Sequence, residues 1–440
     1  MANQQMLEQE IGTILSANPV QLSHPGRSIV ASGLYAQPAN SKLNVVPELN
    51  TIGRLKISSN SLNFGSSSQF QIPPQSFNGQ MFLHGEVACD RYVQATSTWL
   101  LDMIERIEYQ ISGNSSINNV SLDGESHRDL IMASVEGEEK RLKMFRGTDV
   151  VDANAAAVTA SATIPLYLPW SAPDREGAFP FDTSTLSSNI IVTIRWRPGY
   201  RVFFGTSGQS PTLPTAFSAL HLKSFQTDLL NGAFAVSRAM SMDPSLTYSM
   251  PTYLCQSYKV DQSITTGSNT TISLTSLPQG QLVAVLCSAV PTSYKGVSAG
   301  NVAAFWYSPV FSYSELLHNG QQLYLGESLD EIRCINALCK KGGSYDYESR
   351  ASPYAYATPT DRTSFVMAMP LVYNLETALE EKHHQAVPSY GGSVLQHTVQ
   401  IPATGPNGET YPTGEVYTFT YTFIFNSIVE NSNRVTSMVI

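Results

Sequence analysis

Hydrophobic and polar residues alternate along many short segments of the chain, which is the pattern of half-buried β-strands. The clearest alternating segments are Arg54–Ile57, Gln69–Ile72, Ile190–Trp196 and Val416–Phe425. Two others, Met81–Val87 and Gln281–Val290, are mostly apolar and predict strands with more of their surface covered. Glycine and proline residues punctuate the intervals between strands. The pattern therefore predicts an all-β sandwich or jelly roll rather than a sheet built from βαβ units.

Helical periodicity is confined to a few short segments. Ser121–Val135 predicts one helix and Glu327–Leu338 predicts another, and each follows several strands and precedes several more. Trp99–Ile111 fits either a strand or a helix leading into one. The pair Asn319-Gly320 predicts a tight hairpin turn inside the strand-like segment 311–325.

Short fragments of the first half recur in the same order in the second half, about 200 residues later. The matching pairs are Lys56-Ile57 and Lys259-Val260, Gly65-Ser66 and Gly267-Ser268, Gly79-Gln80 and Gly280-Gln281, Glu125-Ser126 and Glu327-Ser328, and Ile164-Pro165-Leu166 and Met369-Pro370-Leu371. A long fixed period indicates a repeated domain. Two unrelated β domains with chance matches are the alternative. We place an N-terminal helix and arm at residues 1–44, a first β domain at 45–235 and a second at 236–440.

Residues 1–17 form an amphipathic helical pattern outside the repeat, which Asn18-Pro19 ends. Its apolar face consists of Met6, Leu7, Ile11, Ile14 and Leu15. Two interpretations stay open for this helix and the Pro-, Ser- and Asn-rich stretch after it. They form either a surface helix on their own domain or an arm that reaches a neighbouring subunit or an underlying layer.

Composition and charge narrow the class of partner. The 440-residue chain has a net charge of −9, and only 14% of its residues are charged, which suggests a surface largely covered by other subunits. The densest basic cluster, at residues 140–146, directly follows the acidic Glu136, Glu138 and Glu139. Direct binding to nucleic acid requires a basic footprint, and none is evident. We therefore expect no direct contact with nucleic acid.

Cysteine usage favours a reducing compartment. Cys89, Cys255 and Cys287 lie in apolar segments and are expected to be buried. Cys334 and Cys339 are five residues apart, on and directly after the second predicted helix, without a second pair of metal ligands. No signal-peptide pattern is present, so we expect synthesis in a reducing compartment. No stretch reaches 18 uninterrupted apolar residues.

The chain lacks the motifs of common catalytic sites, and we expect neither enzymatic activity, a metal nor a cofactor. His383 and His384 point apart on a helix, so they favour a charged surface turn over a metal site with Glu380 and Glu381. His127 and Asp129 likewise do not share a helical face.

A tyrosine-rich segment is the most enzyme-like part of the sequence. Asp346 and Glu348 could act as paired acids among aromatic residues, as in glycosidases. Tyrosine and arginine are also enriched in protein interfaces, which favours an assembly contact. The candidate contact residues are Tyr345, Tyr347, Arg350, Tyr354 and Tyr356.

Beside the two-fold repeat, three segments near the end of the first half carry a resemblance. They are Ala162–Trp170 (ATIPLYLPW), Phe179-Pro180-Phe181 and the final strand pattern Asn189–Ile194. Their order resembles that of the closing strands of a jelly roll. With the N-terminal amphipathic helix, the chain resembles the double jelly-roll major capsid proteins of the tectivirus and adenovirus lineage. The resemblance implies two tandem eight-stranded jelly rolls with short helices in loops.

For function, the same resemblance implies a homotrimer that forms a pseudo-hexagonal capsomer and self-assembles into an icosahedral virus shell. It further implies location in the virion, contacts with neighbouring capsomers and with minor capsid or penton proteins, and an internal membrane as another partner. Segments 197–218, 292–310, 340–362 and 382–413 are the expected long loops. The alternative is a two-domain β-sandwich protein that binds carbohydrate or acts on glycosides, with its groove around Tyr345–Tyr356.

Overall fold

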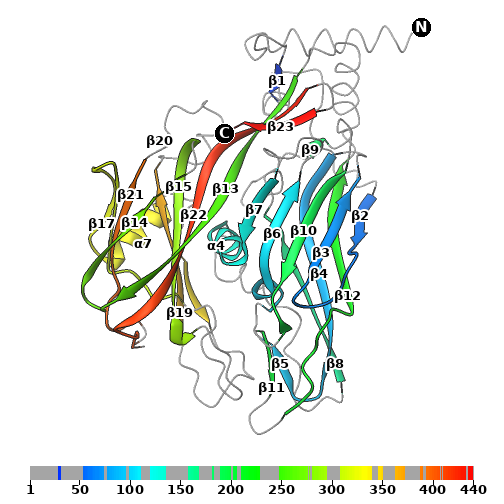
Figure 1. Cartoon of the computed structure of the whole chain (residues 1–440), viewed down its shortest axis with the longest axis horizontal. Coiled ribbons are helices and arrows are strands. Elements are labelled where there is room, and N and C mark those ends of the chain that lie inside the picture. The colour runs from blue at the N-terminus through cyan, green and yellow to red at the C-terminus, as the bar shows by residue number, and fades with distance from the viewer. Residues whose placement is uncertain are drawn as a thin grey trace.

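A computed structural model describes the fold of most of the predicted β segments. The described residues are 28–30, 53–73, 77–95, 99–110, 119–134, 157–167, 181–182, 189–199, 202–205, 210–227, 247–275, 277, 280–294, 308–338, 345–349, 362–371, 387–389, 393–406, 408, 410–432 and 435–439. They form two β-sandwiches that stand side by side, one from each half of the chain (Figure 1). The predicted helix at 1–17 and both predicted domain boundaries lie outside the described residues.

The first sandwich, hereafter the first roll, has two main sheets. One sheet contains, in spatial order, β2 (Gly53–Ser58), β12 (Ala219–Thr227), β4 (Phe77–Asp90) and β8 (Ala157–Pro165), with β9 (Phe181–Asp182) beside β4. The facing sheet contains β3 (Ser67–Ile72), β10 (Ile190–Trp196), β6 (Ile104–Gln110) and β7 (Asn119–Asp123). The smaller elements are α3 (Trp99–Asp102), α4 (Gly124–Ser134) and the pair β5 (Val93–Ala95) and β11 (Phe203–Gly205).

The second sandwich, the second roll, repeats this plan. One sheet contains β13 (Thr247–Ile264), β22 (Glu415–Ser432), β15 (Gly280–Pro291) and β19 (Arg362–Pro370), and it is extended by β1 (Ser28–Val30), β18 (Tyr345–Ser349), β20 (Val387–Ser389) and β23 (Val435–Val439). The facing sheet contains β14 (Asn269–Leu274), β21 (Leu395–Gln400), β16 (Tyr313–His318) and β17 (Gln321–Gly326). Its helices are η4 (Thr292–Tyr294) and α7 (Leu329–Leu338).

Strand order identifies both sandwiches as jelly rolls. The eight main strands of each roll are numbered here from first to eighth along the chain. In one sheet the neighbours run in the order first, eighth, third, sixth. In the facing sheet they run in the order second, seventh, fourth, fifth. The order is the same in both rolls. This order of antiparallel strands is that of two interlocked Greek keys. The predicted fold class, two tandem eight-stranded jelly rolls, is therefore confirmed.

The recurring sequence fragments occupy equivalent places in the two rolls. Gly65 and Gly267 both lie in the turn between the first two strands, with φ of 71° and 78°, a conformation that glycine adopts without strain. The proline fragments end the sixth strand of each roll. There the amide of Leu166 donates to the Met81 carbonyl at 2.9 Å, and the amide of Leu371 donates to the Val283 carbonyl at the same distance. The sequence repeat thus reflects a structural duplication.

The helix that follows the fifth strand begins at the same fragment in both rolls. A glycine precedes each Glu-Ser pair, and a Cβ atom at this position would crowd its neighbours in both rolls. A Cβ atom on Gly124 would lie 1.9 Å from the Ile104 carbonyl oxygen, and one on Gly326 would lie 2.4 Å from Cγ1 of Ile332. Close contact between the helix and the sheet therefore requires glycine at this junction.

Several local predictions are confirmed and others need correction, among them the predicted loops at 197–218 and 340–362, which contain strands β11 and β18. Asn319 and Gly320 have φ of 49° and 82°, as a tight hairpin between β16 and β17 requires. The first predicted helix is wrong at its start, because residues 119–123 pair with β6 as strand β7 and the helix begins at Gly124. The predicted loop at 382–413 is also wrong in part, because Leu395–Gln400 forms β21, the seventh strand of the second roll.

Candidate functional site

The structure describes few of the residues predicted to make assembly contacts. Tyr345 and Tyr347 lie on β18, which pairs with β19 at the edge of a sheet, and nothing is described of their side chains. Arg350, Tyr354 and Tyr356 lie outside the described residues, and so does the N-terminal set Met6, Leu7, Ile11, Ile14 and Leu15. Their role in assembly remains a prediction.

Helix α4 joins the two rolls. It follows β7 of the first roll and packs against β15, β19 and β22 of the second, so it lies between the two sandwiches (Figure 1). Its neighbour β7 lies against β13 of the second roll. Because the helix belongs to one roll and covers a sheet of the other, its side chains decide how the two rolls are held together.

A carboxylate at the start of α4 binds a cation from each roll. Arg197 of the first roll contacts Oε1 of Glu125 at 2.8 Å, and Lys259 of the second roll contacts Oε2 at 2.7 Å. Burial by itself raises the pKa of the Glu125 carboxyl, but the two cations outweigh burial and hold the pKa at about 2. Glu125 is therefore ionised at neutral pH and links the rolls electrostatically.

The middle of α4 inserts charged groups into the interface. The guanidinium of Arg128 contacts Oδ1 of Asp129 at 2.9 Å, and the Ser288 hydroxyl of the second roll donates to Oδ2 at 2.5 Å. Asp129 is fully buried, and burial raises its pKa despite the opposing effects of Arg128 and Ser288. A buried carboxylate is costly unless it is hydrogen-bonded, so these contacts tie α4 to β15 in one position.

His127 points away from the Arg128–Asp129 pair. His127 and Asp129 therefore do not share a helical face, as the sequence predicts. Its Nε2 accepts a hydrogen bond from the Tyr167 amide of the first roll at 3.1 Å. Burial lowers the pKa of His127 to about 3, so the ring is neutral at physiological pH. The role of His127 is structural, within its own roll.

Three further contacts cross between the rolls, one of them from the Lys259 ammonium to Oδ2 of Asp123 at 3.4 Å. The backbone amide of Asp123 donates to the Ser257 hydroxyl at 2.9 Å, and the Cys255 thiol lies 3.3 Å from the Tyr167 hydroxyl. The predicted burial of Cys89, Cys255 and Cys287 is confirmed. Cys334, on α7, is exposed.

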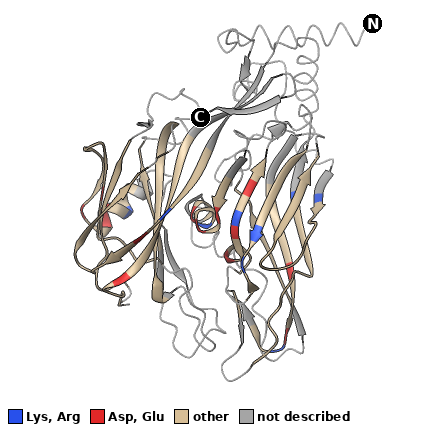
Figure 2. Cartoon of the chain, viewed as in Figure 1, with Lys and Arg blue, Asp and Glu red and all other residues tan. Residues whose placement is uncertain are grey.

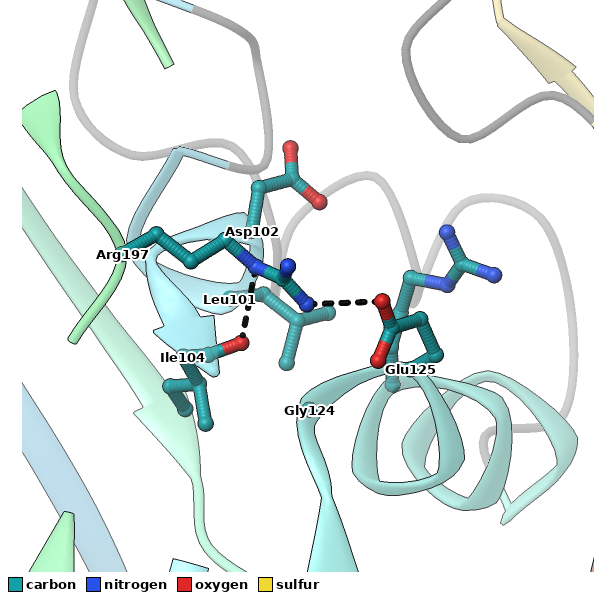
Figure 3. Close-up of a pocket in the computed structure, with 7 residues that line it drawn as sticks. Leu101, Asp102, Ile104, Gly124, Glu125 and Arg197 are labelled. Atoms are coloured by element: carbon teal, nitrogen blue, oxygen red, sulfur yellow. Dashed lines mark hydrogen bonds and ion pairs between the residues drawn. The ribbon is translucent and has the colours of Figure 1, made fainter. Parts of the chain in front are cut away.

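The hollow beside α4 is too small for an ordinary ligand. It is lined by Leu101, Asp102, Ile104, Gly124, Glu125, Arg128 and Arg197 (Figure 3). Its empty volume is about 140 Å³, whereas pockets for small molecules usually measure about 300–1,000 Å³. Arg197 lines it, donating from Nε to the Ile104 carbonyl at 3.2 Å as well as binding Glu125. This site stabilises the interface between the rolls.

The described part of the chain contains no group of three or more histidine, cysteine or acidic side chains placed to hold a metal ion. Among the helices of that part, none combines the length and the apolar character needed to cross a membrane.

Helix α7 has the equivalent place in the second roll, yet it carries its charges on the surface. The Ser328 hydroxyl accepts the Glu331 amide at 3.2 Å, and the Glu331 carboxylate accepts the Glu327 amide at 2.8 Å, which caps the helix. Asp330 is 96% exposed. In the described structure α7 packs mainly against β16, β17 and β19 of its own roll.

No protein-family model and no curated protein matches the sequence. Solved structures match the fold over nearly the whole chain. PBCV-1 VP54, as fitted into a reconstruction of the virophage Sputnik, superposes with a TM-score of 0.60 at 10% identity, over 88% of this chain and 96% of that one. The Faustovirus major capsid protein gives a TM-score of 0.54 at 9% identity over 97% and 98%. The mavirus major capsid protein gives 0.52 at 11% identity over 88% and 90%.

These likenesses agree with the strand order and define the class of fold. The chain is a double jelly roll, the architecture of the viral major capsid proteins with which it superposes. At sequence identities of 9–11%, the comparison establishes the fold alone.

Proposed function

We propose that the protein is a major capsid protein whose homotrimers form pseudo-hexagonal capsomers and self-assemble into an icosahedral virus shell. The observation that carries the proposal is the superposition with major capsid proteins over nearly the full length of both chains. The identical strand order of the two rolls supports it independently.

The physical argument rests on symmetry. Two similar rolls in one chain let three chains present six similar sides, which suits a hexagonal lattice. A capsomer also needs its two rolls to keep a fixed relative orientation. The buried contacts of Asp129 with Arg128 and Ser288, and the bridge from Glu125 to Lys259, supply that rigidity within the chain.

The remaining elements of the proposal follow from this role. The protein acts as a structural component of the virion, without catalytic activity or cofactor, after synthesis in the host cytoplasm. Its partners are other copies of itself, neighbouring capsomers, minor capsid or penton proteins and an internal membrane, and it does not contact nucleic acid directly. We further propose domain boundaries at residues 44/45 and 235/236.

Native mass measurement and electron microscopy of the purified protein test the proposal together. We expect a species of three 48.0 kDa chains and, at high concentration or in particles, hexagonal arrays. A monomer with affinity for glycans would instead support the carbohydrate-binding or glycoside-active alternative. A monomer without such affinity and without arrays would contradict both.

A further inference from the structure

The two rolls differ in how their equivalent sheets are covered. In the second roll, β15 is buried on both faces over nearly its whole length, because α4 covers the outer face. In the first roll, the equivalent strand β4 alternates between buried and partly or fully exposed residues from Met81 to Asp90. Among the described residues, therefore, no helix of the same chain covers the outer face of the first roll's sheet that contains β4.

The part of this uncovered face that β2 and β12 form is basic. Lys56 on β2 lies directly opposite Lys223 on β12, and His221 on β12 lies opposite His84 on β4. The acidic residues of the face lie on β4: Glu86, which contacts His84 at 3.1 Å, and the exposed Asp90 at the end of the strand, away from the two lysines. Neither lysine has an acidic side chain within ion-pair distance among the described residues. Like charges opposite each other across two strands repel, so this face favours an acidic partner.

The acidic counterpart lies on the other roll. Glu327, Asp330 and Glu331 are exposed at the start of α7, and Arg333 is the one described basic side chain of the helix. Figures 1 and 2 show α7 on the left of the molecule and β2 at its right edge. One chain cannot bring these two surfaces together. Surfaces on opposite sides of a molecule make head-to-tail contacts between copies, which close into a ring when the rotation permits.

The contact inside the chain is a template for the contact between chains. Within the chain, Glu125 at the start of α4 binds Lys259 on the first strand of the next roll at 2.7 Å. The repeat places Glu327 at the start of α7, and it places Lys56 on the first strand of the first roll. In both rolls the residue after this lysine, Ile57 or Val260, packs on the core, so both lysines point outward.

We propose that the acidic start of α7 (Glu327, Asp330) docks on the basic outer face of the first roll (Lys56, Lys223) of a second copy of this chain. The inference rests on the proposed trimer and assigns its subunit contact. The docking repeats between chains what α4 does within one, so six helix-to-sheet contacts, three within chains and three between them, close the ring. Like-charged substitutions at either surface therefore weaken the trimer, and exchanging the charges restores it.

Charge exchange tests the docking in the full-length protein. One variant carries Lys56→Glu and Lys223→Glu, a second carries Glu327→Lys and Asp330→Lys, and a third carries all four substitutions. Sedimentation at physiological salt should show the first two variants dissociating at concentrations at least about tenfold higher than the wild type, since repulsion replaces attraction. The third variant should recover most of the loss. A matched control, Glu108→Lys on β6, reverses a half-exposed acidic residue away from both surfaces and should leave the trimer intact.

The outcomes separate the contact from the function. A wild-type trimer that both reversals leave unchanged, or that the four-fold exchange fails to restore, would overturn the docking and leave the capsid proposal standing. A monomeric wild type would overturn both.

Disulfide trapping gives a readout that does not depend on stability. In a background with Cys334→Ser and Cys339→Ser, the pair Lys56→Cys and Glu327→Cys should form covalent dimers and trimers on mild oxidation, because each chain then carries one cysteine for each neighbour. Each single-cysteine variant can form dimers at most. Chains that remain uncrosslinked within an intact trimer would contradict the docking.

Discussion

Helices α4 and α7 occupy the same place in two copies of one fold, yet their chemistry differs. Both follow the fifth strand of a roll, and Gly-Glu-Ser stands at both starts: α4 begins at its glycine and α7 directly after its serine. On α4, residues 126–131 are all buried, including His127, Arg128 and Asp129. On α7, Ile332 is buried and the first-turn acids are exposed.

The difference shows what each helix must contact. The sheet that α4 covers belongs to the same chain. The charged residues of α4 are therefore buried as the chain folds, and Ser288 and Lys259 bind two of them in the folded protein. The start of α7 stays in water in the single chain, and buried charges there would have no partner. A surface that meets its partner only on assembly is better served by exposed charges, which attract without aggregating the free chain.

The glycine that precedes each helix gives the largest expected contrast. Gly124→Ala drives a Cβ atom to within 1.9 Å of a backbone carbonyl, so it should destabilise the protein by more than about 3 kcal/mol. Gly326→Ala meets side chains rather than backbone, Ile332 at 2.4 Å and the Tyr324 hydroxyl at 3.2 Å, and side chains can move, so a cost of about 1–3 kcal/mol is expected. Urea unfolding of the two variants measures the contrast. Equal costs would contradict the closer fit of α4.

Substituting the glutamates that follow these glycines should give the second-largest difference in unfolding free energy. Glu125→Gln removes a carboxylate that is 14% exposed and paired with Arg197 and Lys259, and a loss of about 2–4 kcal/mol is expected. Glu327→Gln alters an exposed side chain and should change the unfolding free energy of the chain by less than about 0.5 kcal/mol. Denaturant titrations of both proteins test this pair. A large effect from Glu327→Gln below the concentration of trimer formation would refute the assignment of that residue to assembly.

Acid should weaken the first roll through α4. The folded pKa of His127 is about 3 against an ordinary 6.5, so the unfolded chain binds its proton first as the pH falls below about 6.5. Glu125, with a folded pKa of about 2 against 4.5, acts with the same sign, and its stabilisation is lost as the pH falls from about 4.5 to 2. The raised pKa of Asp129 opposes both.

The His127→Gln variant isolates one part of this dependence, because glutamine can still accept from the Tyr167 amide and does not titrate. Its stability curve should be flatter than the wild-type curve between pH 6.5 and 4, measured by urea unfolding at each pH. His397 of the second roll, whose pKa is also about 3, remains in the variant and sets the residual slope. An unchanged slope would show that His127 is protonated or exposed.

The smallest effect on the chain itself is expected from the N-terminal segment. Deleting residues 1–18 removes Met6, Leu7, Ile11, Ile14 and Leu15 and should leave the trimer intact, since the helix-to-sheet contacts lie elsewhere. Particle assembly, or attachment to an inner layer, should be weakened. Comparing trimer mass with particle yield measures the two separately. Wild-type particle yield from the truncated protein would refute the arm interpretation.

Much of the β architecture could be predicted because alternation is a local property. Ile190–Trp196 reads as a strand from its own residues and is one. Strand β21 was missed because its pattern includes a histidine at an inward position. His397 is buried and bonds to the Tyr421 hydroxyl at 2.8 Å and the Ser314 hydroxyl at 3.0 Å. Those partners come from other strands, so no local pattern marks the residue as part of the core.

The inter-roll site was not predicted for a similar reason. Glu125 was noticed only as part of a repeated dipeptide, and His127 and Asp129 only as a pair that does not share a face. Their partners Lys259 and Ser288 lie more than a hundred residues away in the sequence. The repeat itself contained a usable signal, since it aligned Lys56 with Lys259 and Glu125 with Glu327.

The sequence by itself determined that the chain is β-rich, that it is built from two related halves and where most of its strands lie, because alternation, turn residues and repetition are written along the chain. Only the tertiary structure decided that α4 is buried between the rolls whereas the start of α7 is exposed. The same three residues, Gly-Glu-Ser, stand at the start of both helices, which differ in what covers them. Burial depends on which surfaces fold together, and that is a property of the whole chain.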